Sequence, residues 1–324
     1  MLDLLDRKIM YELDLNARIS SVQLAKKLRK NKETVNFRIN RLLDQKYLKG
    51  FYTVFNTSKL GWFYYKVYVK LKNITPDKES ELLSWVSKQS YVAYLADIEG
   101  YYDCIFLVLV RTSVDMIKFM NPFMKKYGEF IQEKEIVTFL TTHRLNQKFL
   151  FEGKEKMDWF YPVEIENYKI DDINIKILEL ISRNARISLV DIAKKINVDH
   201  KLVKYRLNKL EKDSIIFAYV TSPNFEKLDT EFVQINISLK DPSLIVKKSM
   251  INYFDGTNKC LFAIELLGKY DLTIEIHVES GAELKTIIDG FREKFVNLYQ
   301  DYDVSTINKE YVVVWGPFGN KGSM

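Results

Sequence analysis

Two stretches of this chain carry cationic and amide side chains at the spacing of one helix face. In the first stretch these are Lys32, Asn36, Arg38, Asn40 and Arg41, and in the second they are His200, Lys201, Lys204, Arg206, Asn208 and Lys209. Lys and Arg bind phosphates, and Lys, Arg and Asn reach base edges in the major groove. The chemistry that these residues offer is recognition of a nucleic acid.

The two stretches belong to a repeat with a fixed offset of 168 residues. The segment NARIS at residues 16–20 recurs letter for letter at 184–188, and the match continues in both directions. A repeat this long indicates two copies of one two-part protein rather than a solenoid. The expected units are two DNA-binding domains (1–60 and 169–228), two further domains (61–150 and 229–318), a linker (151–168) and a tail (319–324).

Each DNA-binding unit is predicted to hold three short helices. Asp3, Ser20 and Asn31 precede apolar runs of helical period and are typical N-caps, and Ser20 with Gln23 forms a capping box. The second copy repeats these features. Alternating residues at 48–54 and 216–220 predict a wing, so the unit is a winged helix-turn-helix whose third helix enters the major groove.

The charge of the chain supports this interpretation. Residues 1–60 carry 13 Lys and Arg against 6 Asp and Glu, and residues 168–227 carry 12 against 8, whereas the rest of the chain is net acidic. Such segregation favours a polyanion partner, double-stranded DNA, for the two basic units. The alternative is a three-helix module with a merely solvated basic face, and His200 alone is more typical of a solvated side chain.

The roles expected on DNA differ along each third helix. Base-reading or base-flanking residues are Lys32, Asn36, Asn40 and Arg41 in one half, and Lys201, Lys204 and Asn208 in the other. Phosphate-holding residues are Arg38, Lys46, Lys49, Arg206 and Lys209.

The second unit of each copy has the predicted order β-α-β-β-α-β. Alternating apolar runs give strands, Pro76 and Pro242 begin helices, and a Gly-x-x-Asp turn joins the second and third strands. This order is typical of a ferredoxin-like domain. The fold class is therefore α+β, with two winged helix-turn-helix and two ferredoxin-like domains in tandem.

The combination resembles the Lrp/AsnC transcription regulators. The residues that carry the likeness in copy one are Leu2-Asp3-x-x-Asp6-x-x-Ile9-Met10, Asn16-Ala17-Arg18, Gln23-Leu24-Ala25, Val35-x-x-Arg38-Ile39-x-x-Leu42 and Gly100-x-x-Asp103; copy two supplies Asp171, Ile177-Leu178, Asn184-Ala185-Arg186, Asp191-Ile192-Ala193, Val203-x-x-Arg206-Leu207-x-x-Leu210 and Gly268-x-x-Asp271. The likeness covers nearly the whole chain.

The resemblance implies that the ferredoxin-like (RAM) domains pair sheet against sheet within the chain, making it a covalent pseudo-dimer that assembles further into homo-oligomers. It also implies an amino acid or another small-molecule effector near the Gly-x-x-Asp turns, at Gly100, Asp103, Gly268 and Asp271. The alternative for these four residues is a structural role, because glycine permits a tight turn and aspartate caps one.

The chain departs from the family pattern at several positions. Lys46 and Ser214 stand where the family usually has glycine before the wing, and Asn174 replaces the acidic residue Asp6. The second wing also lacks the cations Lys46 and Lys49 of the first. Copy two is therefore expected to bind DNA more weakly or to serve partly as a scaffold.

Other functions have less support in the sequence. We find no phosphate loop, nucleophile elbow, metal-ligand spacing or membrane span, and we expect a cytoplasmic protein without catalytic residues, metal or cofactor. An enzymatic alternative is a siroheme decarboxylase, since these enzymes resemble Lrp/AsnC proteins, but His143, His277, Arg111 and Arg144 find no repeat partners. A third alternative is an oligomerisation module without DNA binding.

Overall fold

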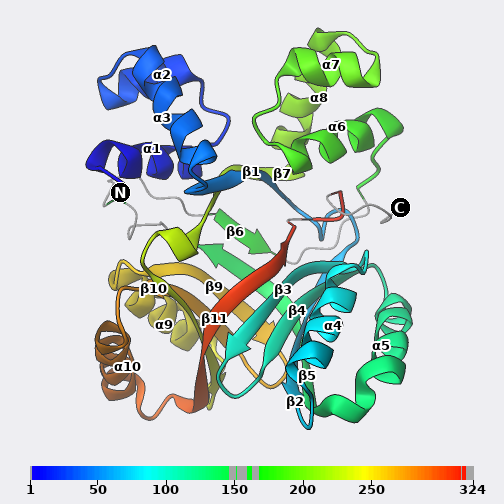
Figure 1. Cartoon of the computed structure of the whole chain (residues 1–324), viewed down its shortest axis with the longest axis vertical. Helices are drawn as coiled ribbons and strands as arrows, with labels where there is room; N and C mark the ends of the chain where they lie inside the picture. Colours follow the sequence, from blue (N-terminus) through cyan, green and yellow to red (C-terminus); the bar gives the residue numbers. More distant parts are fainter. Residues whose placement is uncertain (1, 146–150, 152–158, 163–167, 315, 319–324) are drawn as a thin grey trace.

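The chain folds into a helical end and a barrel end that a two-stranded ribbon separates (Figure 1). The structure, a computed structural model, describes residues 2–145, 151, 159–162, 168–314 and 316–318. Most of the expected linker and all of the expected tail therefore lie outside the described residues.

Each copy begins with three helices whose starts are N-capped. They are α1 (Leu4–Leu15), α2 (Ser21–Leu28) and α3 (Lys32–Asp44) in copy one, and α6 (Asp172–Arg183), α7 (Leu189–Ile196) and α8 (His200–Lys212) in copy two. The predicted caps at Asp3, Ser20 and Asn31 are confirmed, and Ser20 and Gln23 exchange both capping-box hydrogen bonds. Apolar residues of the two trihelical units form one continuous core.

The predicted wings differ from the expectation. β1 (Leu48–Phe55) and β7 (Ile216–Pro223), the strands that follow the third helices, pair antiparallel with each other across the two copies. Neither strand forms a hairpin within its own unit, because its hydrogen-bonding partner is the equivalent strand of the other copy. Lys46 and Ser214 adopt φ angles of 57° and 55° at the entry to these strands, so non-glycine residues occupy the left-handed turn.

The second units have the predicted β-α-β-β-α-β order. The first comprises β2 (Phe63–Leu71), α4 (Pro76–Ser87), β3 (Val92–Glu99), β4 (Cys104–Val110), α5 (Ser113–Tyr127) and β5 (Ile131–Arg144); the second comprises β8 (Glu231–Leu239), α9 (Leu244–Gly256), β9 (Cys260–Leu267), β10 (Leu272–Val278), α10 (Gly281–Phe295) and β11 (Tyr299–Val313). Two short 3-10 helices (Gly128–Phe130 and Phe225–Lys227) and β6 (Trp159–Pro162), which pairs with β5, complete the described elements.

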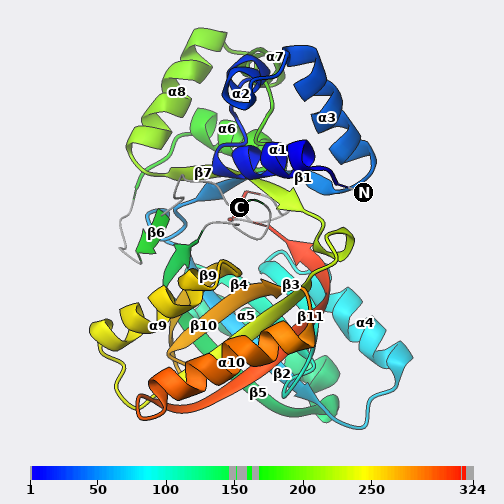
Figure 2. The same cartoon turned by 90° about the vertical axis from the view of Figure 1, so that its left-hand side faces the viewer.

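The two sheets join edge to edge into one barrel. The order is β2-β4-β3-β11-β8-β10-β9-β5, and β5 also pairs with β2. The long strands β5 and β11 make this closure, because each pairs with a strand of its own copy and with one of the other copy. The helices cover the outside of the barrel (Figure 2), and a separate apolar cluster fills its interior.

The NARIS repeat lies where the two halves meet. Arg18 Nη1 donates hydrogen bonds to the carbonyl oxygens of Ala185 and Ile187 at 2.6 and 3.2 Å. Arg186 makes the reciprocal bonds to the carbonyls of copy one, 2.5 Å to Ala17 and 3.2 Å to Ile19. Identical residues bind each other's backbone, as at the twofold axis of a symmetric dimer.

Candidate DNA-binding surface and the cavity beneath the ribbon

The third helices α3 and α8 lie at the same end of the molecule, above the ribbon (Figures 1 and 2). Their apolar residues face the helical core, so the polar side chains at the remaining positions face outward. Most of the predicted DNA-contacting residues are exposed: Lys32, Asn40, Lys46, Lys49, His200, Lys201, Lys204, Asn208 and Lys209. Asn36 is half-buried. Two separated cationic surfaces thus lie at the same end of the molecule.

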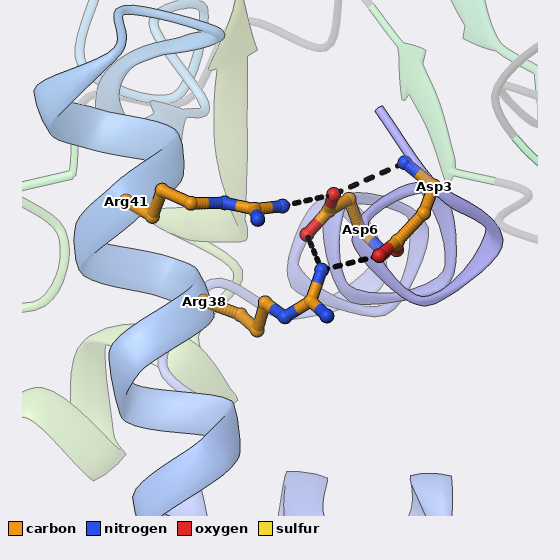
Figure 3. Close-up of polar contacts among 4 residues, drawn as sticks. All are labelled: Asp3, Asp6, Arg38 and Arg41. Atoms are coloured by element: carbon orange, nitrogen blue, oxygen red, sulfur yellow. Dashed lines mark hydrogen bonds and ion pairs between the residues drawn. The ribbon is translucent and has the colours of Figure 1, made fainter. Parts of the chain in front are cut away.

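Three predicted DNA-contacting arginines are held inside the helical units instead. Arg38 contacts Asp3 at 2.5 Å and Asp6 at 3.1 Å, and Arg41 also pairs with Asp6, so these side chains turn from α3 towards the start of α1 (Figure 3). The Asp6 amide and the Arg38 guanidinium lower the pKa of the Asp3 carboxyl to about 2. These pairs fix α3 against α1. In copy two, Arg206 contacts Asp171 at 2.6 Å in the same way.

We call the ion pairs of Arg38 and Arg41 with Asp3 and Asp6 the arginine clamp. The equivalent clamp is incomplete in copy two. Asn174, at the position of Asp6, is buried, and among the described residues its side-chain oxygen has no hydrogen-bond partner. Lys209, at the position of Arg41, lies 3.6 Å from Asp213 on its own helix turn, and its side chain is 51% exposed. The missing carboxylate and the shorter cation occur together, which leaves Lys209 directed to solvent.

Two exposed aromatic residues belong to the same surface and were not predicted. Phe37 and Tyr205 are 64% and 62% exposed on the outer faces of α3 and α8. The offset of 168 aligns them, so the signal in the sequence was an aromatic residue at a non-core helical position in both copies. Aromatic side chains on a DNA-facing helix can contact thymine methyl groups.

The predicted effector residues have structural contacts. The Asp103 carboxylate accepts a hydrogen bond of 2.6 Å from the Leu71 amide, and Asp271 accepts one of 2.7 Å from Leu239. Both glycines lie against the long strand of the other copy. A Cβ on Gly100 would be 2.6 Å from Ser305 Oγ, and one on Gly268, whose φ is +143°, would be 2.8 Å from Val137. The close approach of these strands leaves no room for a side chain, which explains why both positions are glycine.

A cavity lies elsewhere, between the ribbon and the interior of the barrel. Its lining includes Tyr52 and Ser222 from the ribbon and Lys66, Gln234 and Glu275 from the barrel, and none of the four predicted effector residues lines it. Lys66 and Gln234 are buried and occupy equivalent positions of the repeat. The cavity therefore lies apart from the four predicted effector residues, and its lining also includes Lys49, predicted to hold phosphate, and Arg144.

The residues considered for an enzyme have contacts within the protein, and of these residues Arg144 also lines the cavity. His143 contacts Glu265 at 3.1 Å, and Arg144 contacts Asp14 at 2.7 Å. His277 is stacked against Phe225 and Phe232, and burial lowers its pKa to about 3. Within the described ranges there is no group of three His, Cys, Asp or Glu residues that could hold a metal ion. Nor does any described helix have the length and apolar character to cross a bilayer.

Comparison with known proteins relates both copies to transcription regulators. The family described as winged helix-turn-helix DNA-binding matches residues 2–49 and 170–216. A proline dehydrogenase transcriptional activator of Rhizobium radiobacter is 30% identical over 147 residues, which cover 45% of this chain and 92% of that protein. The leucine-responsive regulatory protein of Haemophilus influenzae is 26% identical over 129 residues, 38% of this chain and 74% of that protein.

One solved structure is similar along nearly the entire chain. The siroheme decarboxylase NirDL in complex with an iron-uroporphyrin III analogue superposes with a TM-score of 0.66, covering 98% of this chain and 95% of that chain. The sequence identity is 10%, so this likeness shows the tandem fold and not the activity. The regulator relatives, the two helix-turn-helix matches and the paired RAM domains together place this chain in the Lrp/AsnC family of transcription regulators, as a tandem member.

Proposed function

We propose that the chain is a covalent pseudo-dimer that binds a specific sequence in double-stranded DNA through α3 and α8. The observation that carries this proposal is the placement of the two exposed cationic helices at one end of a duplicated scaffold. Joining two subunits in one chain raises their effective concentration and lets the two DNA readers diverge. An asymmetric DNA site with two unequal half-sites is the expected target.

Within this surface the side chains divide into two groups. Lys32, Asn36 and Asn40 in α3, with Lys201, Lys204 and Asn208 in α8, are proposed to read or flank bases, and Lys46, Lys49 and Lys209 to hold phosphates. The ion pairs of Arg38, Arg41 and Arg206 support a different main role, because a guanidinium bound to Asp3, Asp6 or Asp171 orients its helix on the unit. Any phosphate contact by these arginines would add to that positioning role.

A selection from a random DNA library, using the full chain, tests the proposal. We expect enriched sites with two half-sites about one helical turn, roughly 34 Å, apart. Asn36→Ala should then relax the preference at particular positions, whereas Lys32→Ala should alter base preference or weaken binding. The matched control is Lys248→Ala, an exposed lysine on α9 at the barrel end. No enrichment, or variants of α3 that behave like the control, would refute DNA reading by this surface.

We further propose that a small molecule bound between the two RAM domains modulates DNA binding. The engagement of Gly100, Asp103, Gly268 and Asp271 in turns and close contacts gives them little free chemistry for an effector. The cavity under the ribbon supports the proposal better, because it contacts both the RAM strands and the ribbon that joins α3 and α8 to them.

The full-length fold likeness favours one second candidate, an enzyme of the siroheme decarboxylase type. We rank it below the regulator because the 30%-identical relative is a transcriptional activator, and because His143 and Arg144 already pair with Glu265 and Asp14. Spectra of the purified chain mixed with iron-uroporphyrin III discriminate the two. A bound tetrapyrrole with a shifted absorption band would promote the enzyme, and an unchanged spectrum would remove it.

A further inference from the structure

The cavity under the ribbon has an aromatic and polar lining suited to a molecule smaller than a drug-sized ligand. Its volume is about 160 Å³, below the roughly 300–1,000 Å³ that drug-sized ligands occupy. Tyr52, Val54 and Ser222 of the ribbon line one side, and barrel residues line the other. A molecule in this space touches the element that connects directly to both third helices.

The cavity straddles the repeat, and its charged positions differ between copies. Equivalent lining residues are Tyr64 and Phe232, Tyr94 and Phe262, Lys66 and Gln234, Leu107 and Glu275, and Thr142 and Glu310. The aromatic pairs are preserved as aromatic. Each charged residue, in contrast, has an uncharged counterpart. The walls are therefore nearly symmetric while the charge is not, and a ligand of matching chemistry has one polar end and an apolar body.

Lys66 is the charge in the cavity that lacks a hydrogen-bond partner. The side chain is 1% exposed, and among the described residues no acceptor lies within hydrogen-bond distance of its Nζ, which sits 4.9 Å from the ring centre of Tyr68. Burial lowers the pKa of Lys66 to about 8, although the Glu275 and Asp303 carboxylates oppose this shift. A buried ammonium without an acceptor is costly, and an anion beside it removes that cost.

Of the other charges that line the cavity, Glu275 and Arg144 have hydrogen-bond partners in the protein, and Lys49 is exposed to solvent. Gln234 Nε2 donates a hydrogen bond of 2.9 Å to the Glu275 carboxyl, and Arg144 is bound to Asp14 at 2.7 Å. One buried cation without a hydrogen-bond acceptor among the described residues, between aromatic walls, suits a single negative charge. A phosphate monoester would bring more charge than Lys66 can neutralise.

We propose that this cavity binds a small carboxylic acid with an apolar body, its carboxylate on Lys66 Nζ and its body against the aromatic walls. The bound acid bridges the ribbon and the barrel, and so sets the position of α3 and α8 and the affinity for DNA. This regulation rests on the proposed DNA-binding function, whereas binding of the acid does not.

Calorimetry on the full chain tests the ligand class with three probes of one shape. 3-Phenylpropionate carries the acid, 3-phenylpropionamide replaces the charge, and L-phenylalanine adds an ammonium group. A series from acetate to 3-phenylpropionate varies the apolar body. We expect the affinity to rise with the size of the apolar body. The amide should bind at least about tenfold more weakly than the acid, because a hydrogen bond to a charged group is stronger than one to a neutral group. No binding by any acid in the series, or equal binding of acid and amide, overturns the proposal. Tighter binding of L-phenylalanine overturns the assignment to a simple acid.

Two variants test the site itself. Lys66→Gln introduces the residue that copy two has at Gln234 and should lower the affinity for 3-phenylpropionate by about 10- to 100-fold. Lys248→Gln makes the same exchange on exposed α9 and should leave it unchanged. If Lys66→Gln does not fold, Leu107→Trp, which fills the cavity from the strand position opposite Lys66 and keeps the lysine, should also abolish binding. Wild-type affinity in either folded cavity variant refutes the site.

DNA titrations separate the two proposals. We expect 3-phenylpropionate to change the affinity of the wild-type chain for its selected DNA, and to have no effect on the Lys66→Gln chain. Binding of the acid without any DNA binding refutes the proposed function alone. DNA binding without acid binding refutes the cavity alone, and acid binding that leaves DNA affinity unaltered refutes the coupling.

Discussion

The two helix-turn-helix units differ in how the third helix is held, and agree in how the units meet each other. In copy one, the buried Asp6 accepts both Arg38 and Arg41, and Asp3 adds a further contact. Copy two retains only the Arg206–Asp171 pair of this clamp. The reciprocal contacts of Arg18 and Arg186 are the same in both directions.

This difference shows which contacts a tandem protein can vary. The contact between units is shared, so a change in either copy would affect both halves. The ion pairs between the first and third helices lie within one unit. One copy can therefore lose part of them, and gain a more exposed cation, without affecting the other copy. Lys209 and Asn174 together make that exchange: α8 loses a link to α6, and its surface gains an exposed lysine.

The largest effect is expected from removing the centre of the clamp. Asp6→Ala leaves Arg38 and Arg41 without their shared carboxylate and should lower the free energy of unfolding by about 3 kcal/mol, the low end for a buried pair because both arginines reach solvent. Urea unfolding of the variant and of the matched Asn174→Ala chain measures the difference. Equal losses in the two variants would contradict the asymmetry of the clamp.

The shared contact should respond equally from both sides. Arg18→Ala and Arg186→Ala each remove hydrogen bonds to two carbonyls of the other copy, and each should cost about 2 kcal/mol of unfolding free energy. Urea unfolding of the two single variants gives both values. A loss confined to one of them would show that the units do not meet symmetrically.

The exposed cation of copy two should act on DNA more than on stability. Lys209→Ala should reduce the slope of log affinity against log salt concentration by about 0.9, as expected for one lost phosphate contact, with little change in unfolding. Arg41→Ala should show the reverse pattern, because its guanidinium is bound to Asp6. Fluorescence titrations at several salt concentrations decide between these outcomes.

The smallest effect is expected on the stability of the protein at low pH. The pKa of Asp3 lies at about 2, below its ordinary value of 3.8, because its carboxylate accepts the Asp6 amide hydrogen bond and contacts Arg38. A depressed folded-state pKa contributes stability above pH 3.8 that is lost as the pH falls towards 2. The difference in urea midpoint between wild type and Asp3→Asn should therefore shrink over this interval. A difference that stays constant would exclude the ionised carboxylate as its source.

Local features of the fold were predictable from sequence because they depend on near neighbours. The N-caps and helical periods of α1 to α3 and the capping box of Ser20 and Gln23 need only residues three or four positions apart, and they are present as expected. The β-α-β-β-α-β order follows from alternating runs and from the Gly-x-x-Asp turns. The pairing of the wing strands could not be predicted in this way, because the alternation of residues in a strand does not indicate which strand it pairs with.

The candidate site shows the same limit. The spacing of Arg38 beside base-reading positions predicts a phosphate contact. It does not predict the ion pairs with Asp6 and Asp3, because these partners lie 32 and 35 residues earlier in the chain. The sequence around Lys66 does not predict a binding site, because a single lysine in an apolar strand forms no recognisable motif. Phe37 and Tyr205 were visible in the repeat and could have been found by asking which non-core positions stay aromatic.

The amino-acid sequence by itself determined that this protein is a duplicated regulator with two capped trihelical units and two ferredoxin-like units. Helical periods and caps depend on neighbouring residues, and the offset of 168 residues is found by comparing the sequence with itself. Only the tertiary structure decided that β1 pairs with β7, that Arg18 and Arg186 bind across the halves, and that Lys66 is enclosed with no acceptor among the described residues. Those features depend on contacts between residues far apart in the chain, and such contacts exist only once the two copies have closed on each other.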